Sequence, residues 1–157
     1  MIRELDEIES PHLLQLLEWW KSAGSGERLP LRRDFDPVHY PRLWPYLLIC
    51  DVERNHAENL HFIYRYAGTQ LERNFKTKVT GKDITEMPIE DALNSIFDQF
   101  LRTAEERRPT YCEHEFITSN QRFVHYVRLL LPASKDGNTV DFLIGACHFL
   151  RAWEESP

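Results

Sequence analysis

An alternating run of residues, preceded by a short apolar run, constrains the fold of this chain more than any other feature. The apolar run spans residues 46–53, and a polar turn at 55–59 separates it from the alternating run at 60–69. Aromatic side chains occupy every other position of the second run, which is the pattern of a strand with one buried face. These aromatic residues are Phe62, Tyr64 and Tyr66. The two runs predict a β-hairpin that ends at Gly68 and leads into a helix capped near Thr69.

The strongest helical pattern lies between residues 88 and 107. Apolar side chains recur there at spacings of three and one, and Pro109 ends the helix. The stripe consists of Ile89, Ala92, Leu93, Ile96, Phe97, Phe100, Leu101 and Ala104. Three further strands are expected at 110–118, 122–131 and 139–150. The order of two strands, helices and three strands predicts an α+β domain: a five-stranded antiparallel sheet with helices packed on one face, plus an N-terminal helix.

The N-terminal helix begins at Ser10-Pro11, which supply a cap and a first helical residue, and it stops at Gly24. Its apolar face includes Leu13, Leu17 and Trp20. Two uses of this face are open: it contacts a second copy of the chain in a homodimer, or it covers the sheet of its own chain. Residues 29–45 contain four prolines, which exclude a long helix or a central strand and predict an ordered wrap.

Length and charge narrow the class of protein. At 157 residues the chain is long enough for one core, so we predict one structural domain. Its parts are the helix and Pro-rich wrap (1–45), the core (46–152) and a tail (153–157). The net charge of −6 argues against nucleic-acid binding. Three widely spaced cysteines suit buried thiols in a reducing cytoplasm, and no run has the length of a membrane span. We expect a cytoplasmic protein.

Seven short motifs, in this order, resemble the bacterial PAS_5 family of PAS domains, once catalogued as a domain of unknown function. The motifs are Trp20; Leu29-Pro30 with Arg33-Asp34 and Asp36-Pro37; Pro41-Arg42-Leu43; Arg65-Tyr66-Ala67-Gly68-Thr69; Thr80-Gly81-Lys82 with Ile84; Arg128-Leu129-Leu130-Leu131-Pro132; and Val140-Asp141-Phe142-Leu143-Ile144-Gly145. The resemblance spans nearly the whole chain.

The resemblance implies a sensory or interaction module that is often dimeric, signals through a separate protein partner and does not catalyse a reaction. PAS domains elsewhere hold haem, flavin or small metabolites between the sheet and the helices. Flavin-adduct PAS domains need a cysteine in the segment that corresponds to 83–87, and haem-binding ones take a histidine from the long helix. This chain has neither. We therefore expect no haem and no flavin, and an unidentified small molecule remains open.

A pocket between the sheet and the helices, as in other PAS domains, would be lined by aromatic and aliphatic residues. Buried tyrosine hydroxyls in it need hydrogen-bond partners, which a ligand can supply. The lining residues are Phe62, Tyr64, Tyr66, Thr69, Ile84, Ile96, Phe97 and Phe100. The alternative is that the aromatic residues fill the core, which would make the protein a ligand-free interaction scaffold. A small cone-shaped α+β isomerase or hydrolase is a third, less favoured reading, since it requires a buried Asp–His or Asp–Tyr pair.

Other polar residues on the predicted strands carry weaker signals. Cys112 and His114 lie on one face of a strand and could supply two ligands of a metal site. His125 or His148 could complete the site only if the register of the neighbouring strands happened to place them beside this pair. We predict no metal and no catalytic residues. We expect Arg65 and Arg128 on the outer face of the sheet, either solvated or facing a partner.

Overall fold

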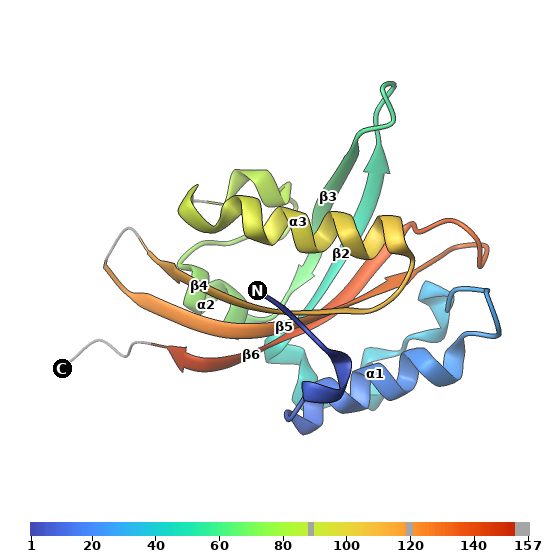
Figure 1. Cartoon of the computed structure of the whole chain (residues 1–157), viewed down its shortest axis with the longest axis horizontal. Helices are drawn as coiled ribbons and strands as arrows, with labels where there is room; N and C mark the ends of the chain where they lie inside the picture. The colour runs from blue at the N-terminus through green and yellow to red at the C-terminus, as the bar shows by residue number, and fades with distance from the viewer. Residues whose placement is uncertain (88–89, 119–120, 153–157) are drawn as a thin grey trace.

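The computed structural model describes residues 1–87, 90–118 and 121–152; the predicted tail lies outside them. In this part of the chain a six-stranded sheet has the order β1-β4-β5-β6-β2-β3, with every neighbouring pair antiparallel (Figure 1). The strands are β1 (Ile2–Arg3), β2 (Leu47–Arg54), β3 (Leu60–Ala67), β4 (Thr110–Ile117), β5 (Phe123–Ala133) and β6 (Phe142–Ala152). The predicted antiparallel α+β fold is confirmed. The sixth strand, β1, was missed because two residues carry no periodicity.

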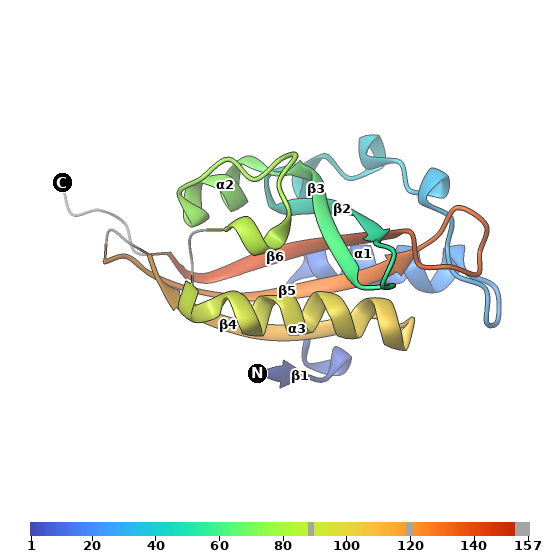
Figure 2. The ribbon, with the colours of Figure 1, turned by 90° about the horizontal axis from the view of Figure 1, so that it is seen from above.

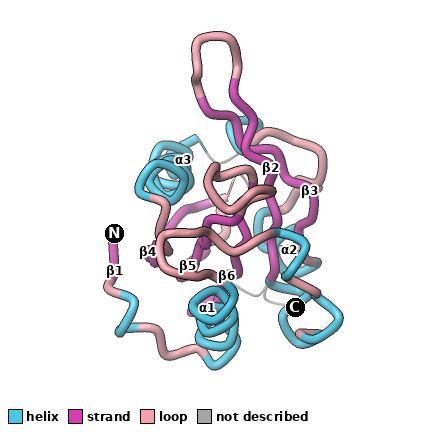
Figure 3. The backbone as a smooth tube through the Cα atoms, turned by 90° about the vertical axis from the view of Figure 1, so that its right-hand side faces the viewer, coloured by secondary structure: helices cyan, strands magenta, loops and turns pink. Residues whose placement is uncertain are grey.

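Helices lie on both faces of the sheet. They are α1 (Pro11–Ala23), α2 (Thr69–Phe75) and α3 (Glu90–Glu106), and short 3-10 turns occupy most of the Pro-rich wrap. Helix α3 runs along β4 and β5, as Figure 2 shows, and α2 lies on the same side. Helix α1 contacts β5 and β6 from the opposite side (Figure 3). We call the side of α2 and α3 the inner face and the side of α1 the outer face.

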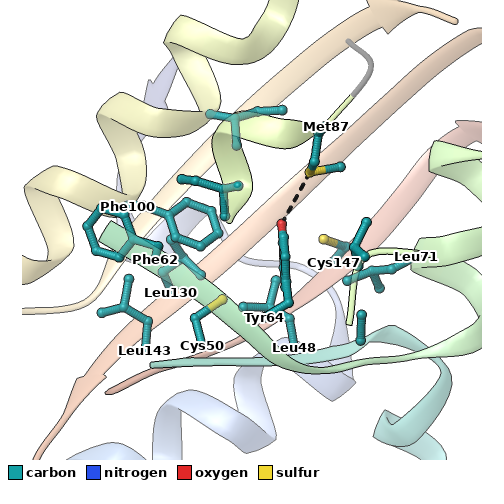
Figure 4. Close-up of a cluster of buried hydrophobic side chains, with 14 of the residues drawn as sticks. Leu48, Cys50, Phe62, Tyr64, Leu71, Met87, Phe100, Leu130, Leu143 and Cys147 are labelled. Carbon is teal, nitrogen blue, oxygen red and sulfur yellow. Dashed lines mark hydrogen bonds between the residues drawn. The ribbon is translucent and has the colours of Figure 1, made fainter. Parts of the chain in front are cut away.

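Aromatic and aliphatic side chains fill much of the layer on the inner face (Figure 4). Phe62 on β3 meets Phe100 on α3 edge to face, with ring centroids 5.5 Å apart, and both side chains are fully buried. Phe97 approaches the same ring of Phe62 at 5.8 Å. These contacts tie the hairpin to the long helix, as the two sequence patterns predict. The predicted stripe residues Ile89, Ala92 and Leu93 have side chains outside the described part of the structure.

Helix α1 buries its apolar face against its own chain. Leu13 and Leu17 are only 1% and 4% exposed and belong to a core that includes Leu129 of β5 and Ile144 of β6. The indole Nε1 of Trp20 donates a hydrogen bond to the Pro132 carbonyl oxygen at 2.8 Å. The prediction that Leu13 and Leu17 form a dimer interface is therefore wrong, and the alternative, that the helix covers the sheet, is what the structure shows. The homodimer itself stays a prediction.

A bulge in the β2–β3 hairpin changes the direction of Tyr66. Ile49 pairs with Tyr66 whereas Cys50 pairs with Tyr64, so Arg65 is an extra residue in β3. One extra residue reverses the alternation of the side chains that follow it. Tyr66 is consequently 38% exposed, and its hydroxyl donates to the Trp44 carbonyl oxygen at 3.0 Å. The predicted placement of Tyr66 beside Phe62 and Tyr64 is wrong for this reason.

Replacement of Leu17 by alanine tests the packing of α1. We expect Leu17→Ala to lower the free energy of unfolding by about 2–5 kcal/mol, because it leaves a cavity under the helix. Leu14 is 39% exposed on the same helix, and Leu14→Ala is the matched control, expected within about 0.5 kcal/mol of the parent. Urea unfolding followed by circular dichroism measures both. Equal effects of the two substitutions would contradict the burial of α1.

Candidate functional site

An arginine lies inside the layer between α3 and the sheet. Arg128 on β5 is 1% exposed, and its cross-strand partners are Cys112 on β4 and Cys147 on β6. Burying a charged group is costly unless it is paired and hydrogen-bonded. The surroundings of Arg128 therefore decide what this layer can hold.

Neutral groups surround the guanidinium. Its Nε–H donates to Gln99 Oε1 at 2.9 Å, and its Nη2 lies 3.3 Å from His114 Nε2. The guanidinium carbon lies over the Phe100 ring at 4.8 Å from the centroid and 5.7 Å from that of Tyr126. Among the side chains that the structure describes, no carboxylate forms an ion pair with Arg128. Within this part of the chain, dipoles and aromatic faces balance the positive charge.

Gln99 on α3 fixes the position of this cluster. Its amide Nε2 donates to the Arg128 carbonyl oxygen at 2.9 Å and to Thr110 Oγ1 at 3.2 Å. Thr103, one turn further along α3, donates to the Gln99 carbonyl oxygen at 2.7 Å, and its hydroxyl lies 2.7 Å from that of Thr110. Both hydrogens of the Gln99 amide therefore have acceptors, and its Oε1 has to face Arg128.

His114 on β4 is neutral at physiological pH. Burial, and then the charge of Arg128, lower the pKa of His114 from 6.5 to about 2. Its Nδ1 lies 3.2 Å from Ser95 Oγ, and its Nε2 lies 2.9 Å from Gln99 Oε1. The described part of the cluster consequently carries a single positive charge, that of Arg128.

Tyr126 on β5 contributes a buried hydroxyl whose hydrogen has no acceptor among the described residues. Its ring is stacked with that of His114 at 5.2 Å between centroids, and the side chain is fully buried. Among the described residues its hydroxyl is the one buried side-chain polar atom that has no hydrogen bond. Burial raises the pKa of Tyr126, so the hydroxyl keeps its proton. Among the residues that the structure describes, a donor that lacks an acceptor thus lies in the same layer as a cation that lacks an anion.

A cavity of about 250 Å³ reaches the edge of this cluster. It lies between α2, which contributes Gln70 and Asn74, the start of α1 at Ser10 and His12, and the part of β6 that extends beyond its pairing with β2. Cys147 and Phe149 of β6 line it. Cys147 is the cross-strand partner of Arg128, and the Phe149 ring centroid lies 5.6 Å from that of Tyr126. The cavity is therefore separated from the polar cluster by a single layer of side chains.

Five of the eight predicted lining residues are fully buried in the inner layer. They are Phe62, Tyr64, Ile84, Ile96 and Phe100. Phe97 is half-buried there, and the Tyr64 hydroxyl donates to the Met87 sulfur at 3.5 Å, as Figure 4 shows. Thr69 is exposed at the first residue of α2, so its predicted place in the lining is wrong, as is that of Tyr66.

The predicted outward position of Arg128 is also wrong. Val124, Tyr126 and Arg128 occupy every second position of β5 and therefore lie on the same face of the strand. Because Tyr126 is a large aromatic residue, this spacing was the signal that could have placed Arg128 inside. Arg65, in contrast, is exposed and forms an ion pair with Asp51.

Cys112 and His114 are buried and pair with Arg128 and Tyr126 of β5, so they share the inner face, as their spacing predicts. His125, however, is hydrogen-bonded to Glu113 at 3.0 Å, and His148 lines a cavity together with Arg3, Tyr111 and Glu113. No group of three or more possible metal ligands occurs within the described ranges.

Comparison with known proteins identifies the family. The PAS_5 model, described as a PAS domain, matches residues 8–148. The chain belongs to the PAS domain family. No curated protein matches this PAS domain. None of the helices in the described part of the chain has the length and apolar character that a membrane-spanning helix requires.

Solved structures show the same fold at low sequence identity. A LOV protein of Rhodobacter sphaeroides is similar with a TM-score of 0.52 and 11% identity, over 74% of this chain and 69% of that chain. The PAS domain of a Colwellia psychrerythraea protein gives a TM-score of 0.52 and 7% identity, over 72% and 95%. An RNA-binding light-oxygen-voltage receptor gives 0.51 and 11% over 96% of this chain, which spans 36% of that receptor.

Replacement of Tyr126 by phenylalanine tests whether its hydroxyl lacks a hydrogen-bond acceptor. We expect Tyr126→Phe to raise the free energy of unfolding of the ligand-free protein by about 1 kcal/mol, because a buried donor without an acceptor is costly. Tyr64→Phe is the control: its hydroxyl has an acceptor, so its removal brings no gain. Urea unfolding measures both, and a loss of stability in Tyr126→Phe would show that the hydroxyl has a partner.

The depressed pKa of His114 predicts a pH dependence of stability. In the unfolded chain His114 binds a proton below about pH 6.5, whereas in the folded chain it binds one only near pH 2. The free energy of unfolding therefore falls as the pH falls between these two values. Each pH unit accounts for at most about 1.4 kcal/mol. Between pH 7 and pH 5 we expect the parent to lose about 2 kcal/mol more than His114→Gln. Parallel pH profiles of the two proteins would contradict a neutral His114.

Proposed function

We propose that this PAS domain is a sensory module that holds a small molecule between α3 and the sheet and does not catalyse a reaction. The observation that carries the proposal is that β5 and β6 contribute side chains to the cores on both faces of the sheet. Arg128 points into the candidate site, while its neighbours Val127 and Leu129 belong to the core beneath α1. On β6, Cys147 lies on the inner face and Ala146 beneath α1. A shift of either strand therefore reaches α1.

Helix α1 is joined to the sheet by a specific polar contact as well as by apolar packing. The hydrogen bond from Trp20 to the Pro132 carbonyl oxygen links the helix to the end of β5, four residues beyond Arg128. Signalling requires two states that differ in affinity for the ligand. Strand displacement on ligand binding, transmitted through this contact, is the mechanism that we propose.

The chemistry of the inner layer supports a binding role over a catalytic one. The buried polar side chains in the described part of the chain include no aspartate or glutamate, so the Asp–His or Asp–Tyr pair of a cone-shaped isomerase or hydrolase is not among them. His114, with a pKa of about 2, is a poor proton acceptor at neutral pH. Non-catalytic function is accordingly part of the proposal.

Flavin and haem are not part of the proposal. The segment 83–87 contains no cysteine, and the ring of Phe62 packs against both Phe97 and Phe100 in the inner layer. A homodimer, a separate signalling partner and a cytoplasmic location also belong to the proposal. Any dimer would use a surface other than Leu13 and Leu17.

A ligand screen with two readouts tests this function. Small neutral, anionic and cationic metabolites are added to the full chain, and the melting temperature and tryptophan emission are recorded. We expect at least one compound to raise the melting temperature and to change the emission. In Trp20→Phe the same compound should still raise the melting temperature but give a smaller emission change.

Stabilisation by no compound would overturn ligand sensing and favour the ligand-free scaffold with a filled core. Stabilisation with an emission change that is the same in Trp20→Phe would overturn the route through α1.

A further inference from the structure

We infer that the ligand of this site is a small monocarboxylate whose carboxylate group binds Arg128 and accepts a hydrogen bond from the Tyr126 hydroxyl. The inference rests on the proposed function, because it names the chemical class of the molecule that the inner layer holds. Nothing in the family match or in the similar structures assigns it.

The charge of the site points to a single negative charge. Arg128 is permanently protonated, His114 is neutral, and the described residues supply no carboxylate to pair with the guanidinium. Transfer of a buried cation from water without a counter-ion is costly, so an anion that enters the layer regains part of that cost. One uncompensated positive charge matches one negative charge, whereas a doubly charged phosphate would leave a negative charge buried.

The supply of hydrogen-bond acceptors points to a carboxylate. Gln99 Oε1 accepts from Arg128 Nε–H and lies within 2.9 Å of His114 Nε2, so one oxygen serves two neighbours. Arg128 Nη2 has only the 3.3 Å contact with a nitrogen of His114, and the Tyr126 hydroxyl has no partner among the described residues. A carboxylate has two oxygens with about four lone-pair sites and matches the arginine fork. It can therefore serve both unsatisfied groups at once.

The rest of the ligand has to be apolar and small. Apart from the polar cluster, the side chains that surround Arg128 and Tyr126 are aromatic, aliphatic or thiol groups; they include Phe75, Phe100, Phe116, Cys147 and Phe149. The cavity of about 250 Å³ beside Cys147 and Phe149 gives the direction in which the ligand extends; Ser10, His12, Gln70, Asn74 and His148 line its far side, so the apolar part has to end at Cys147 and Phe149. The size of the cavity is below the usual range of pockets for drug-sized ligands, which suits an aliphatic or single-ring acid.

Matched pairs of acids and amides test the carboxylate. The probes are the straight-chain acids from acetate to octanoate, benzoate and phenylacetate, each compared with its primary amide, with inorganic phosphate as a dianion. We expect at least one acid to bind the full chain in isothermal titration calorimetry, with its amide at least tenfold weaker and phosphate not bound. Equal binding of acid and amide, or binding of none of the acids, would overturn the inference.

Two substitutions locate the bound acid. Tyr126→Phe removes one hydrogen bond and should weaken the acid about tenfold while the ligand-free protein remains folded. Tyr111→Phe, on the outer face of β4, is the matched control and should leave the affinity unchanged. Arg128→Gln should abolish binding. If that variant does not fold, Tyr126→Phe decides, and equal affinities of the two tyrosine variants would overturn the assignment.

Failure of this inference is distinguishable from failure of the proposed function. If neutral or cationic compounds stabilise the protein and the acids do not, ligand sensing stands and the carboxylate assignment falls. If no compound of any charge stabilises it, both fall.

Discussion

Arg128 places a permanent positive charge between two apolar layers, and the inner face of the sheet is arranged around it. The side-chain oxygen of Gln99 faces the guanidinium because the amide nitrogen donates to Thr110 at the start of β4 and to the Arg128 carbonyl oxygen. His114 stays neutral because burial lowers its pKa, and the charge of Arg128 lowers that pKa further. In a medium of low polarisability each of these neutral contacts is stronger than in water, and each missing contact is more costly. The position of α3 over β4 and β5 therefore depends on polar contacts as much as on its apolar stripe.

This arrangement explains why an apparently filled core is compatible with ligand binding. Phe62 and Phe100 are in contact, and most of the predicted lining is buried. Yet, within the described ranges, the hydroxyl of Tyr126 has no hydrogen bond and the charge of Arg128 has no ion-pair partner. A protein selected only for stability would replace them with apolar residues at little cost. Both groups lie in one layer near a cavity, and this is the basis of the proposal that the core holds a ligand.

The fold could be predicted from the sequence because its long elements have strong periodicity. The stripe around Ile96 and Phe100 and the alternation at Phe62 and Tyr64 each specify one buried face, and the structure confirms both. The site could not be predicted so well. A single inserted residue at Arg65 turned Tyr66 outward, and local patterns do not show such a bulge. Arg128 was assigned to the outer face because charge was given more weight than its parity with Tyr126.

The packing of α1 has a consequence for the order in which the protein can fold. The helix is synthesised first, but the surface that it covers belongs to β5 and β6, near the other end of the chain; the contact from Trp20 to Pro132 spans 112 residues. Contacts so distant in sequence slow folding, because the intervening chain has to be ordered before they form. Until then the leucines of α1 remain in water, together with the outer face of the sheet. Nascent chains of this protein therefore pass through a stage with two exposed apolar surfaces, a stage at which aggregation competes with folding.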